Sequence, residues 1–470
     1  MMVNQPVSKV IIKMAIPTII AFLITSIYNL ADTFFVAELG TNATAAVSVN
    51  ASLDQLIMMC GSMLAVGANS YIARLLGQGN DKKASQVLST AFFLAFGIGA
   101  LLLVIGSWQM EGMVRLLGAT DTCAEYSIDY ARYVLLAAPF MATSFVMNQC
   151  LRSEGSATLS MIGMGFGGVL NCILDPLFIL GSEGLAATYG IHLPFYFPAM
   201  KVAGASLATA ISKVVSFGIL IFPYLVRRSL LHLSIRNFRP NWDIISNTIS
   251  VGSSSMFRSG LAVVSAILLN KLAGSISDAV LAGIGVCNKV MMFPFSIILG
   301  FGTGFQPVAG FNWGARRYDR VQESFRFSSW VAIIGGAAMA AVCIFATDQI
   351  IGAFAKGDSD MHRLGALCIR LQAIALPVHS WVAVVNMLCS GLGSAGNALL
   401  LSTSRQGSCF LPILYPMAFL WGEYGLCAVQ AVADVLTLAL AIPIAIYMVR
   451  KIKTARLNSE AQAQPEGEKV

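Results

Sequence analysis

The stretch Gly77-Gln78-Gly79-Asn80-Asp81-Lys82-Lys83 ends one long apolar run and begins another. The same arrangement returns 237 residues later as Gly314-Ala315-Arg316-Arg317-Tyr318-Asp319-Arg320. At an offset of 238, four further features recur: Arg132, Pro139, Asn148 and Gly155-Ser156-Ala157 return as Arg370, Pro377, Asn386 and Gly393-Ser394-Ala395. The sequence therefore predicts two homologous halves, an organisation found in many membrane transporters.

The composition predicts a membrane protein. Of the 470 residues, 57% are hydrophobic and only 11% are charged, and the mean hydropathy is +0.74. A soluble domain typically has about 25% charged residues, so soluble enzymes and nucleic-acid-binding proteins are excluded. The ten cysteines contain no CxxC pair, and nine fall in or beside apolar runs. We therefore expect neither a disulfide framework nor a cysteine metal site.

Apolar runs bounded by charged residues or by Gly, Pro and Asn predict twelve transmembrane helices. The expected spans are 13–36, 45–72, 87–110, 127–150, 157–180, 202–226, 244–273, 279–311, 327–347, 364–390, 396–420 and 425–449. The expected fold is all-α, with two pseudo-symmetric six-helix bundles. The expected domains are an N-lobe at 1–226, a cytoplasmic linker at 227–243, a C-lobe at 244–456 and a disordered tail at 457–470.

The basic residues predict how the chain is oriented. Assigning the loops to alternate sides places eighteen Lys and Arg residues on the side of the N-terminus and six on the other. By the positive-inside rule, both termini are cytoplasmic, and we expect a multi-pass protein of a bacterial plasma membrane. Six spans per half is an even number, so both halves enter from the same side and form a parallel repeat.

Polar residues at one depth predict an ion site in the first half. Asp32 lies about six residues from the outer end of its span, and Asp175 lies at a similar depth with Asn171 one turn deeper on the same face. Thr209 lies about eight residues below the outer surface in the sixth span. Carboxylate, amide and hydroxyl oxygens suit Na⁺, and two close carboxylates also suit a proton.

A structural alternative is open for these acids, because Asp175 precedes Pro176 and could cap its helix, while Asp32 could pair with a basic residue. The repeat favours a functional site. The second-half equivalents of the four predicted site residues carry no carboxylate, since they fall near Ala266, Cys409, Ile413 and Gln430. A structural need shared by both halves would have kept the acids in both.

Other residues within the spans are weaker candidates. We expect Pro17 to kink the first helix or leave it bendable, and Tyr28, Gln55 and Asn148 to contact substrate. Glu154 lies at the cytoplasmic mouth as a loop or gate contact. Six intramembrane charges are expected to form mainly structural pairs, such as Asp434 with one of three basic residues: Asp54, Lys213, Arg258, Lys289, Arg405 and Asp434.

Three motifs resemble those of the MATE family, the multidrug and toxic compound extrusion antiporters. Tyr28-Asn29-Leu30-Ala31-Asp32-Thr33-Phe34-Phe35 is similar to that family's first-helix signature, and Pro17 matches its kinking proline. Gln306-Pro307-Val308-Ala309-Gly310-Phe311-Asn312-Trp313-Gly314-Ala315 resembles the eighth-helix motif, and Ser404-Arg405-Gln406 one in the eleventh. By overall pattern the chain is most similar to the MepA-like subgroup.

The resemblance implies a V-shaped pair of bundles and efflux of cationic or amphipathic compounds driven by H⁺ or Na⁺. It matches Asp32, Asn171, Asp175 and Thr209 to the ion site of the DinF-like branch, with the Ala205 carbonyl as a further ligand. The seventh and tenth helices carry Arg258 and His379 where the NorM-like branch has acids, which argues against a second Na⁺ site in the C-lobe.

Two other functions stay open at this stage. A flippase for lipids or lipid-linked oligosaccharides would need several cationic residues in its cavity, and the acidic N-lobe argues otherwise. A membrane-embedded transferase would need a DDxxD motif or a catalytic histidine placed for chemistry, and neither is present. The sequence also lacks a P-loop for ATP. We therefore expect a non-enzymatic, monomeric carrier with small-molecule substrates, in contact with the lipid bilayer, with no cofactor other than its coupling ion.

Overall fold

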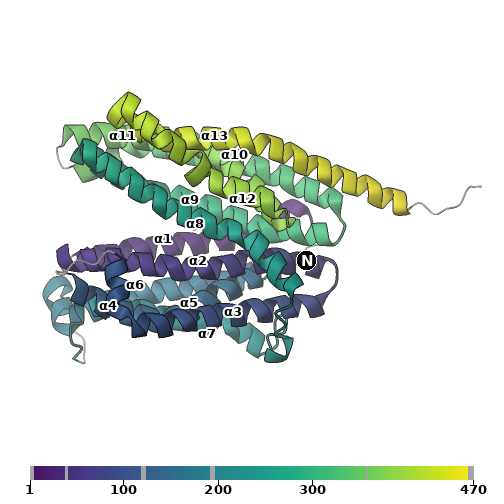
Figure 1. Ribbon diagram of the computed structural model, residues 1–470, viewed down its shortest axis with the longest axis horizontal. Helices are drawn as coiled ribbons and strands as arrows, with labels where there is room; N and C mark the ends of the chain where they lie inside the picture. Colours follow the sequence, from purple (N-terminus) through teal and green to yellow (C-terminus); the bar gives the residue numbers. More distant parts are fainter. Residues whose placement is uncertain (1–4, 38–40, 118–122, 191–195, 356–357, 464–470) are drawn as a thin grey trace, which may run out of the picture. The chain divides into compact units, whose positions relative to one another are not determined.

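The computed structural model describes residues 5–37, 41–117, 123–190, 196–355 and 358–463, and this part of the chain is almost entirely helical (Figure 1). Eleven of its segments are long and apolar enough to cross a membrane. The last of them, Ala395–Ala461, has 67 residues and is too long for one crossing. Its backbone leaves helical geometry at Gly422 (φ 54°, ψ −128°). Counted on either side of Gly422, the described spans number twelve, as predicted.

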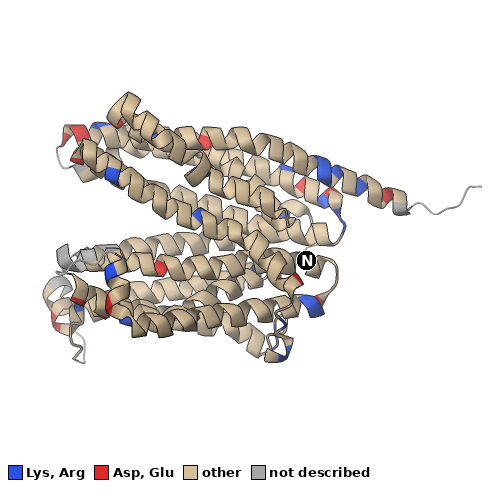
Figure 2. Cartoon of the chain, viewed as in Figure 1, with Lys and Arg blue, Asp and Glu red and all other residues tan. Residues whose placement is uncertain are grey.

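The surface of the helices suits a lipid environment. Large apolar side chains are widely exposed, including Phe345 at 84%, Phe419 at 88% and Val342 at 68%. Few charged residues lie in the middles of the helices (Figure 2). A soluble protein would not expose so much contiguous apolar surface, so the chain is a multi-pass membrane protein.

Contacts between residues divide the chain into two compact units. Unit 1 comprises Met1–Ile19, Ala73–Asn80 and Ile249–Val470, and unit 2 comprises Ile20–Ile72 and Asp81–Thr248. These borders differ from the predicted lobes, because two short segments of the first half belong with the C-terminal helices.

Glycines explain why those two segments belong to unit 1. The two segments pack against helix α9 (Asp278–Gly314), which carries these glycines. A Cβ atom at Gly304 of α9 would come within 2.7 Å of the Ala15 Cα. A Cβ at Gly314 would come within 2.0 Å of the Arg74 carbonyl oxygen. Because glycine has no side chain, the backbones pack directly against each other at these points.

Unit 2 holds most of the first seven helices. These helices are α1 (Val7–Ala37), α2 (Thr41–Gly77), α3 (Asp81–Trp108), α4 (Met110–Leu116), α5 (Ala124–Ser153), α6 (Ala157–Tyr189) and α7 (Lys201–Leu225), followed by the 3₁₀ turn η1 (Ile235–Asn237) and the start of α8 (Trp242–Ile276). Helix α5 packs against both α3 and α7, and α6 packs against α7. Helix α6 changes direction at Gly181 (φ 69°, ψ −179°), near the predicted end of the fifth span.

Unit 1 is built around α11 (Ser359–Gly391), which packs against α9, α10 (Tyr318–Ala355) and α13 (Phe410–Ala463). The remaining elements are α12 (Ala395–Thr403) and the π-helical turn η2 (Ser404–Ser408). Helix α13 continues beyond the apolar run, and an ion pair of 2.8 Å joins Arg456 to Glu460 one turn later. Residues 457–463 are therefore helical where we expected disorder, and residues 464–470 lie outside the described part.

The sequence repeat is visible in the backbone at matching helix ends of the two halves of the chain. Gly79 and its equivalent Arg316 both have positive φ, at 71° and 57°. After each of them the chain closes the helix in the same way, with Asn80 N–H donating to the Leu75 carbonyl and Arg317 N–H to the Asn312 carbonyl. These are the hydrogen bonds of a Schellman helix end.

The repeated prolines also pack alike. A Cβ at Gly99 of α3 would lie 2.5 Å from the Pro139 Cα, and one at Gly336 of α10 would lie 2.7 Å from the Pro377 Cα. Each unit thus uses one glycine to receive the proline of its central helix.

Candidate functional site

Helices α6 and α7 bring three of the predicted ion-site residues into contact. The Asn171 side-chain amide donates to Asp175 Oδ1 at 3.1 Å and to Thr209 Oγ1 at 3.3 Å. Asp175 is fully buried and Asn171 is 2% exposed. The spacing of four residues places Asn171 and Asp175 one turn apart on the same face of α6, which is why the pair could be read from the sequence.

Two further carboxylates lie near this group. Asp32 of α1 interacts electrostatically with both Asp175 and Asp54, and Asp54 belongs to α2. We call Asp32, Asp54, Asn171, Asp175 and Thr209 the carboxylate cluster. Among the described residues, no donor reaches four of its buried oxygens: Asp32 Oδ1, Asp54 Oδ1, Asn171 Oδ1 and Asp175 Oδ2. Buried oxygens without a donor are suited to hold a proton or a cation.

Sequence reasoning missed two neighbours of this site. Asp54 was expected to form a structural pair, yet it lies near Asp32 as well as Lys213. Tyr130 of α5 is 3% exposed and lies in the field of Asp32, Asp54 and Asp175. A tyrosine in a helix gives no sequence signal of an ion site. Asp54 does give one, because it is the lone acid of the second predicted span.

The carboxylate cluster could bind a metal ion only through oxygen atoms of several different kinds of side chain. In the described part of the chain, no three His, Cys, Asp or Glu side chains come close enough to hold a metal ion. A Na⁺ site here would therefore depend on the Asn171 and Thr209 oxygens beside one or two carboxylates. Ala205 is fully buried one turn before Thr209 on α7, and its carbonyl as a ligand stays a prediction.

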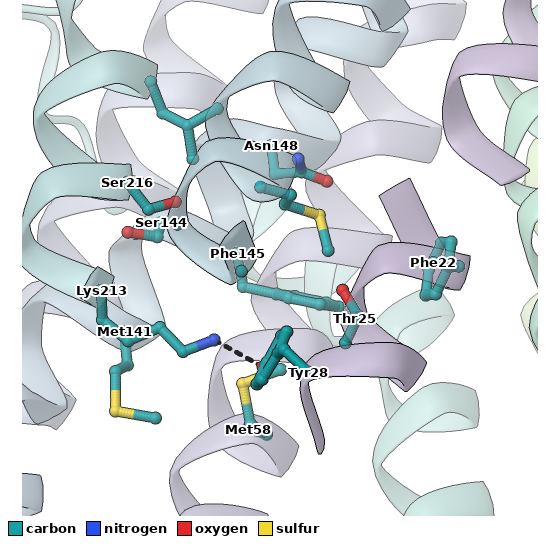
Figure 3. Close-up of a pocket in the computed structure, with 14 residues that line it drawn as sticks. Phe22, Thr25, Tyr28, Met58, Met141, Ser144, Phe145, Asn148, Lys213 and Ser216 are labelled. Carbon is teal, nitrogen blue, oxygen red and sulfur yellow. Dashed lines mark hydrogen bonds between the residues drawn. The ribbon is translucent and has the colours of Figure 1, made fainter. Parts of the chain in front are cut away.

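A pocket of about 120 Å³ opens between α1, α2, α5, α6 and α7 of unit 2 (Figure 3). Two of the three predicted substrate contacts, Tyr28 and Asn148, line this pocket, whereas Gln55 does not. The remaining lining residues are Phe22, Thr25, Met58, Met141, Ser144, Phe145, Met164, Gly167, Gly168, Lys213, Ser216 and Leu220. The pocket is largely apolar with a few polar groups, as small-molecule sites usually are.

A hydrogen bond crosses this pocket from α7 to α1. The Lys213 ammonium donates to the Tyr28 hydroxyl at 2.8 Å and lies 4.9 Å from the centre of the Tyr28 ring (Figure 3). A Cβ at Gly168 would come within 2.9 Å of the Tyr28 ring. The glycine therefore makes room for the ring that Lys213 holds.

Glu154 lies in the turn between α5 and α6, outside the membrane spans. Its carboxylate accepts hydrogen bonds from the Tyr224 hydroxyl at 3.0 Å, the Leu230 backbone N–H at 3.2 Å and the Ser229 hydroxyl. Burial raises the pKa of Glu154 to about 7, although these hydrogen bonds oppose the shift. Glu154 therefore ties this turn to the end of α7 and to the linker that follows.

Comparison with known proteins assigns the chain to a family. The MatE family model matches residues 17–177 and 255–420, one segment in each half of the repeat. The chain belongs to the MatE family. This match confirms the resemblance to the MATE family that the motifs of the first, eighth and eleventh helices indicate.

Curated MatE relatives include the multidrug export protein MepA of Staphylococcus saprophyticus, which is 26% identical, and that of Staphylococcus aureus strain MSSA476, which is 24% identical. In each case the alignment covers 95% of this chain and 95% of the relative. A MATE transporter solved in an outward-facing conformation matches with a TM-score of 0.87 at 22% identity, over 96% of this chain and 98% of that one. A MATE structure in the bent conformation matches with a TM-score of 0.85 at 23% identity, covering 98% of each chain.

In this MatE chain two of the remaining candidate charges of unit 1, Arg405 and Asp434, form an ion pair. Arg405 Nε lies 2.7 Å from Asp434 Oδ1, and the two side chains are 16% and 4% exposed. The Arg405 guanidinium also stacks 4.5 Å from the Phe295 ring centre. Arg258, in contrast, donates to Ser255 Oγ of its own helix at 3.2 Å. Of the three partners considered for Asp434, the structure selects Arg405.

Pro17 lies inside α1, and α1 is helical on both sides of it. Because proline has no N–H, the carbonyl four residues earlier loses its helical hydrogen bond. The border between the two units falls between Ile19 and Ile20, two residues after Pro17. That Pro17 acts as a bending point of α1 stays a prediction, and the position of this border agrees with it.

Proposed function

We propose that this MatE protein is a secondary active multidrug efflux transporter that exchanges H⁺ or Na⁺ for cationic or amphipathic compounds. The observation that carries the ion part is the carboxylate cluster, with four buried oxygens that no described donor reaches. The export function is supported by the curated MepA relatives, which are named multidrug export proteins. Neither line of support calls for an enzyme active site or a cofactor besides the coupling ion.

Helix geometry supports coupling between the cluster and the pocket. Tyr28 of the pocket and Asp32 of the cluster lie four residues apart on α1, and Lys213 and Thr209 are related in the same way on α7. Residues spaced by four lie one turn apart on the same face. A change of charge at Asp32 can therefore shift Tyr28, because both side chains move with one helix.

The proposed cycle follows from this arrangement. In the outward-facing state an ion or proton binds near Asp32 and Asp175, rearranges α1 and displaces substrate from the pocket. Release of the ion to the cytoplasm resets the carrier. A ligand can shift such an equilibrium only by its difference in affinity between the two states, so the cluster must differ in its affinity for the ion between them.

The setting that we propose is a bacterial plasma membrane with both termini in the cytoplasm, as the basic loops predict. The proposed partners are small molecules and lipid, and we propose that the carrier works as a monomer. The proposed transport function does not depend on the orientation of the termini or on the oligomeric state.

Transport by the purified chain in liposomes tests the function. Ethidium, which is a cation, and rhodamine B, which carries a carboxylate, are offered under an imposed pH gradient and, separately, an imposed Na⁺ gradient. We expect one gradient to drive transport of at least one dye. We expect Asp175→Asn and Asp32→Asn to abolish this response, because each removes an ionisable group of the cluster.

Glu183→Gln is the matched control, since Glu183 is an exposed acid on the same helix as Asp175. It should transport like the wild type. Transport that responds to neither gradient, in protein shown to be correctly inserted, would overturn the proposal. So would full ion-driven transport by Asp175→Asn.

A further inference from the structure

The pocket of unit 2 carries a positive charge where a site for cations would be expected to carry a negative one. Among its lining residues, all of which are described, Lys213 is the one with a formal charge, and none is an acid. Its ammonium has three donors, and the hydrogen bond to the Tyr28 hydroxyl uses one of them. In the part of the chain that the structure describes, no ion pair joins Lys213 to a carboxylate, although Asp54 lies within electrostatic range.

A second cation lies directly behind the wall. Arg152 is fully buried, and its guanidinium lies 5.4 Å from the centre of the Phe22 ring and 3.6 Å from the Met164 sulfur. Phe22 and Met164 both line the pocket. Arg152 Nε donates to the Ser160 hydroxyl at 2.9 Å, so a second cationic group lies next to two side chains that line the pocket.

The Lys213 ammonium has a neutral hydrogen-bond partner, and the carboxylate of Asp54 acts on it from beyond ion-pair distance, so its other donors can serve a ligand. Charges interact strongly where water is excluded, and a hydrogen bond between two charged groups is stronger than one between neutral groups. An anionic group that enters the pocket would therefore gain affinity from Lys213, whereas a cation would be repelled. The aromatic and methionine side chains offer an adaptable apolar surface for the rest of the molecule.

We propose that this pocket binds amphipathic compounds through an anionic group, such as a carboxylate, held by Lys213, with the apolar body against Phe22, Phe145 and the methionines. Asn148 can accept a hydrogen bond from a donor elsewhere on the ligand, because its amide N–H donates to the Ser160 carbonyl at 3.0 Å while its Oδ1 has no described partner. Figure 3 shows Asn148 and Lys213 on different sides of the pocket. This inference rests on the proposed efflux function and narrows its substrate class.

Binding of three probes with one aromatic ring tests the proposal without any ion gradient. The probes are 4-fluorobenzoate, 4-fluorobenzamide and 4-fluorobenzylammonium, which are anionic, neutral and cationic, and ¹⁹F NMR titration of the purified full-length protein measures their affinities. A cavity of this order of size accepts a single aromatic ring. We expect the benzoate to bind at least about tenfold more tightly than the benzamide, and the ammonium to bind most weakly.

Three variants identify the group responsible. Lys213→Met should bring the ratio of benzoate to benzamide affinity close to one, and Lys213→Arg should retain most of it. Lys271→Met removes an exposed lysine of α8 and should leave the ratio unchanged. Equal binding of the three probes by the wild type, tighter binding of the ammonium, no binding of any probe, or a ratio that survives Lys213→Met would each overturn the proposal.

The wild-type comparison stands even where a Lys213 variant fails to fold. Failure of this inference is also distinguishable from failure of the efflux function. Selective benzoate binding without ion-driven dye transport would keep the ligand class and reject the efflux function. Ion-driven transport without benzoate selectivity would keep the efflux function and reject the anionic ligand class.

Discussion

Tyr28 and Lys213 are joined by a hydrogen bond of 2.8 Å, and each lies one helical turn from a residue of the carboxylate cluster. Tyr28 is one turn from Asp32 on α1, and Lys213 is one turn from Thr209 on α7. The pocket and the proposed ion site are thus built on the same two helices. This arrangement gives a direct physical route by which ion binding can change the pocket.

The proline contact in unit 1 predicts opposite effects at two adjacent glycines. In Gly336→Ala the new methyl group would lie 2.7 Å from the Pro377 Cα, whereas at Gly335 it would meet nothing within 4 Å. We expect Gly336→Ala to destabilise the protein by about 1–3 kcal/mol through overpacking. Gly335→Ala should be neutral or stabilise by up to about 1 kcal/mol through helix propensity. Thermal unfolding in detergent measures both, and equal unfolding temperatures would contradict the packing argument.

The buried pair Arg405–Asp434 predicts strong coupling between two substitutions. Replacing one partner leaves a buried charge uncompensated, so Asp434→Leu should cost about 3–5 kcal/mol. The double variant Arg405→Met with Asp434→Leu should recover most of this loss, because both charges are then removed. Unfolding of the single and double variants gives the coupling energy. Additive losses would show that the two side chains do not depend on each other.

Glu154 predicts a pH dependence of stability near neutrality. Burial raises its pKa to about 7 from the ordinary value of 4.5, so the folded state favours the protonated form. This contribution is therefore fully present below about pH 4.5 and is lost as the pH rises through about 7. From pH 5 to pH 8 the unfolding temperature of Glu154→Gln should fall less than that of the wild type, by roughly 2–4 °C. Parallel curves for the two proteins would contradict this assignment.

Most of the fold could be predicted because hydropathy and the repeat report the same elements. The predicted ends were less accurate, since apolar runs mark only the part of a helix inside the lipid. Helix α10, for example, begins at Tyr318, nine residues before the predicted start at 327, and its first turns carry Asp319 and Glu323. The unit borders depend on glycine contacts such as Gly304 with Ala15, which a single sequence does not reveal.

The site could be predicted where its members share a helix. Asn171 and Asp175 are one turn apart, and this spacing is visible in the sequence. The positions of Asp54, Tyr130 and Lys213 depend on how α2, α5 and α7 are rotated about their axes, which sequence periodicity defines poorly in helices that are apolar on every side. The pairing of Asp434 with Arg405 was uncertain for the same reason.

The most direct test of the central claim is the affinity of the purified protein for its transported dye, measured as a function of pH and, separately, of Na⁺ concentration. Because coupling between two ligands is reciprocal, we predict that wild-type affinity falls as the concentration of the coupling ion rises. The double variant Asp32→Asn with Asp175→Asn should bind the dye with an affinity that neither ion changes. An ion dependence that persists undiminished in this variant would contradict the assignment of coupling to the carboxylate cluster.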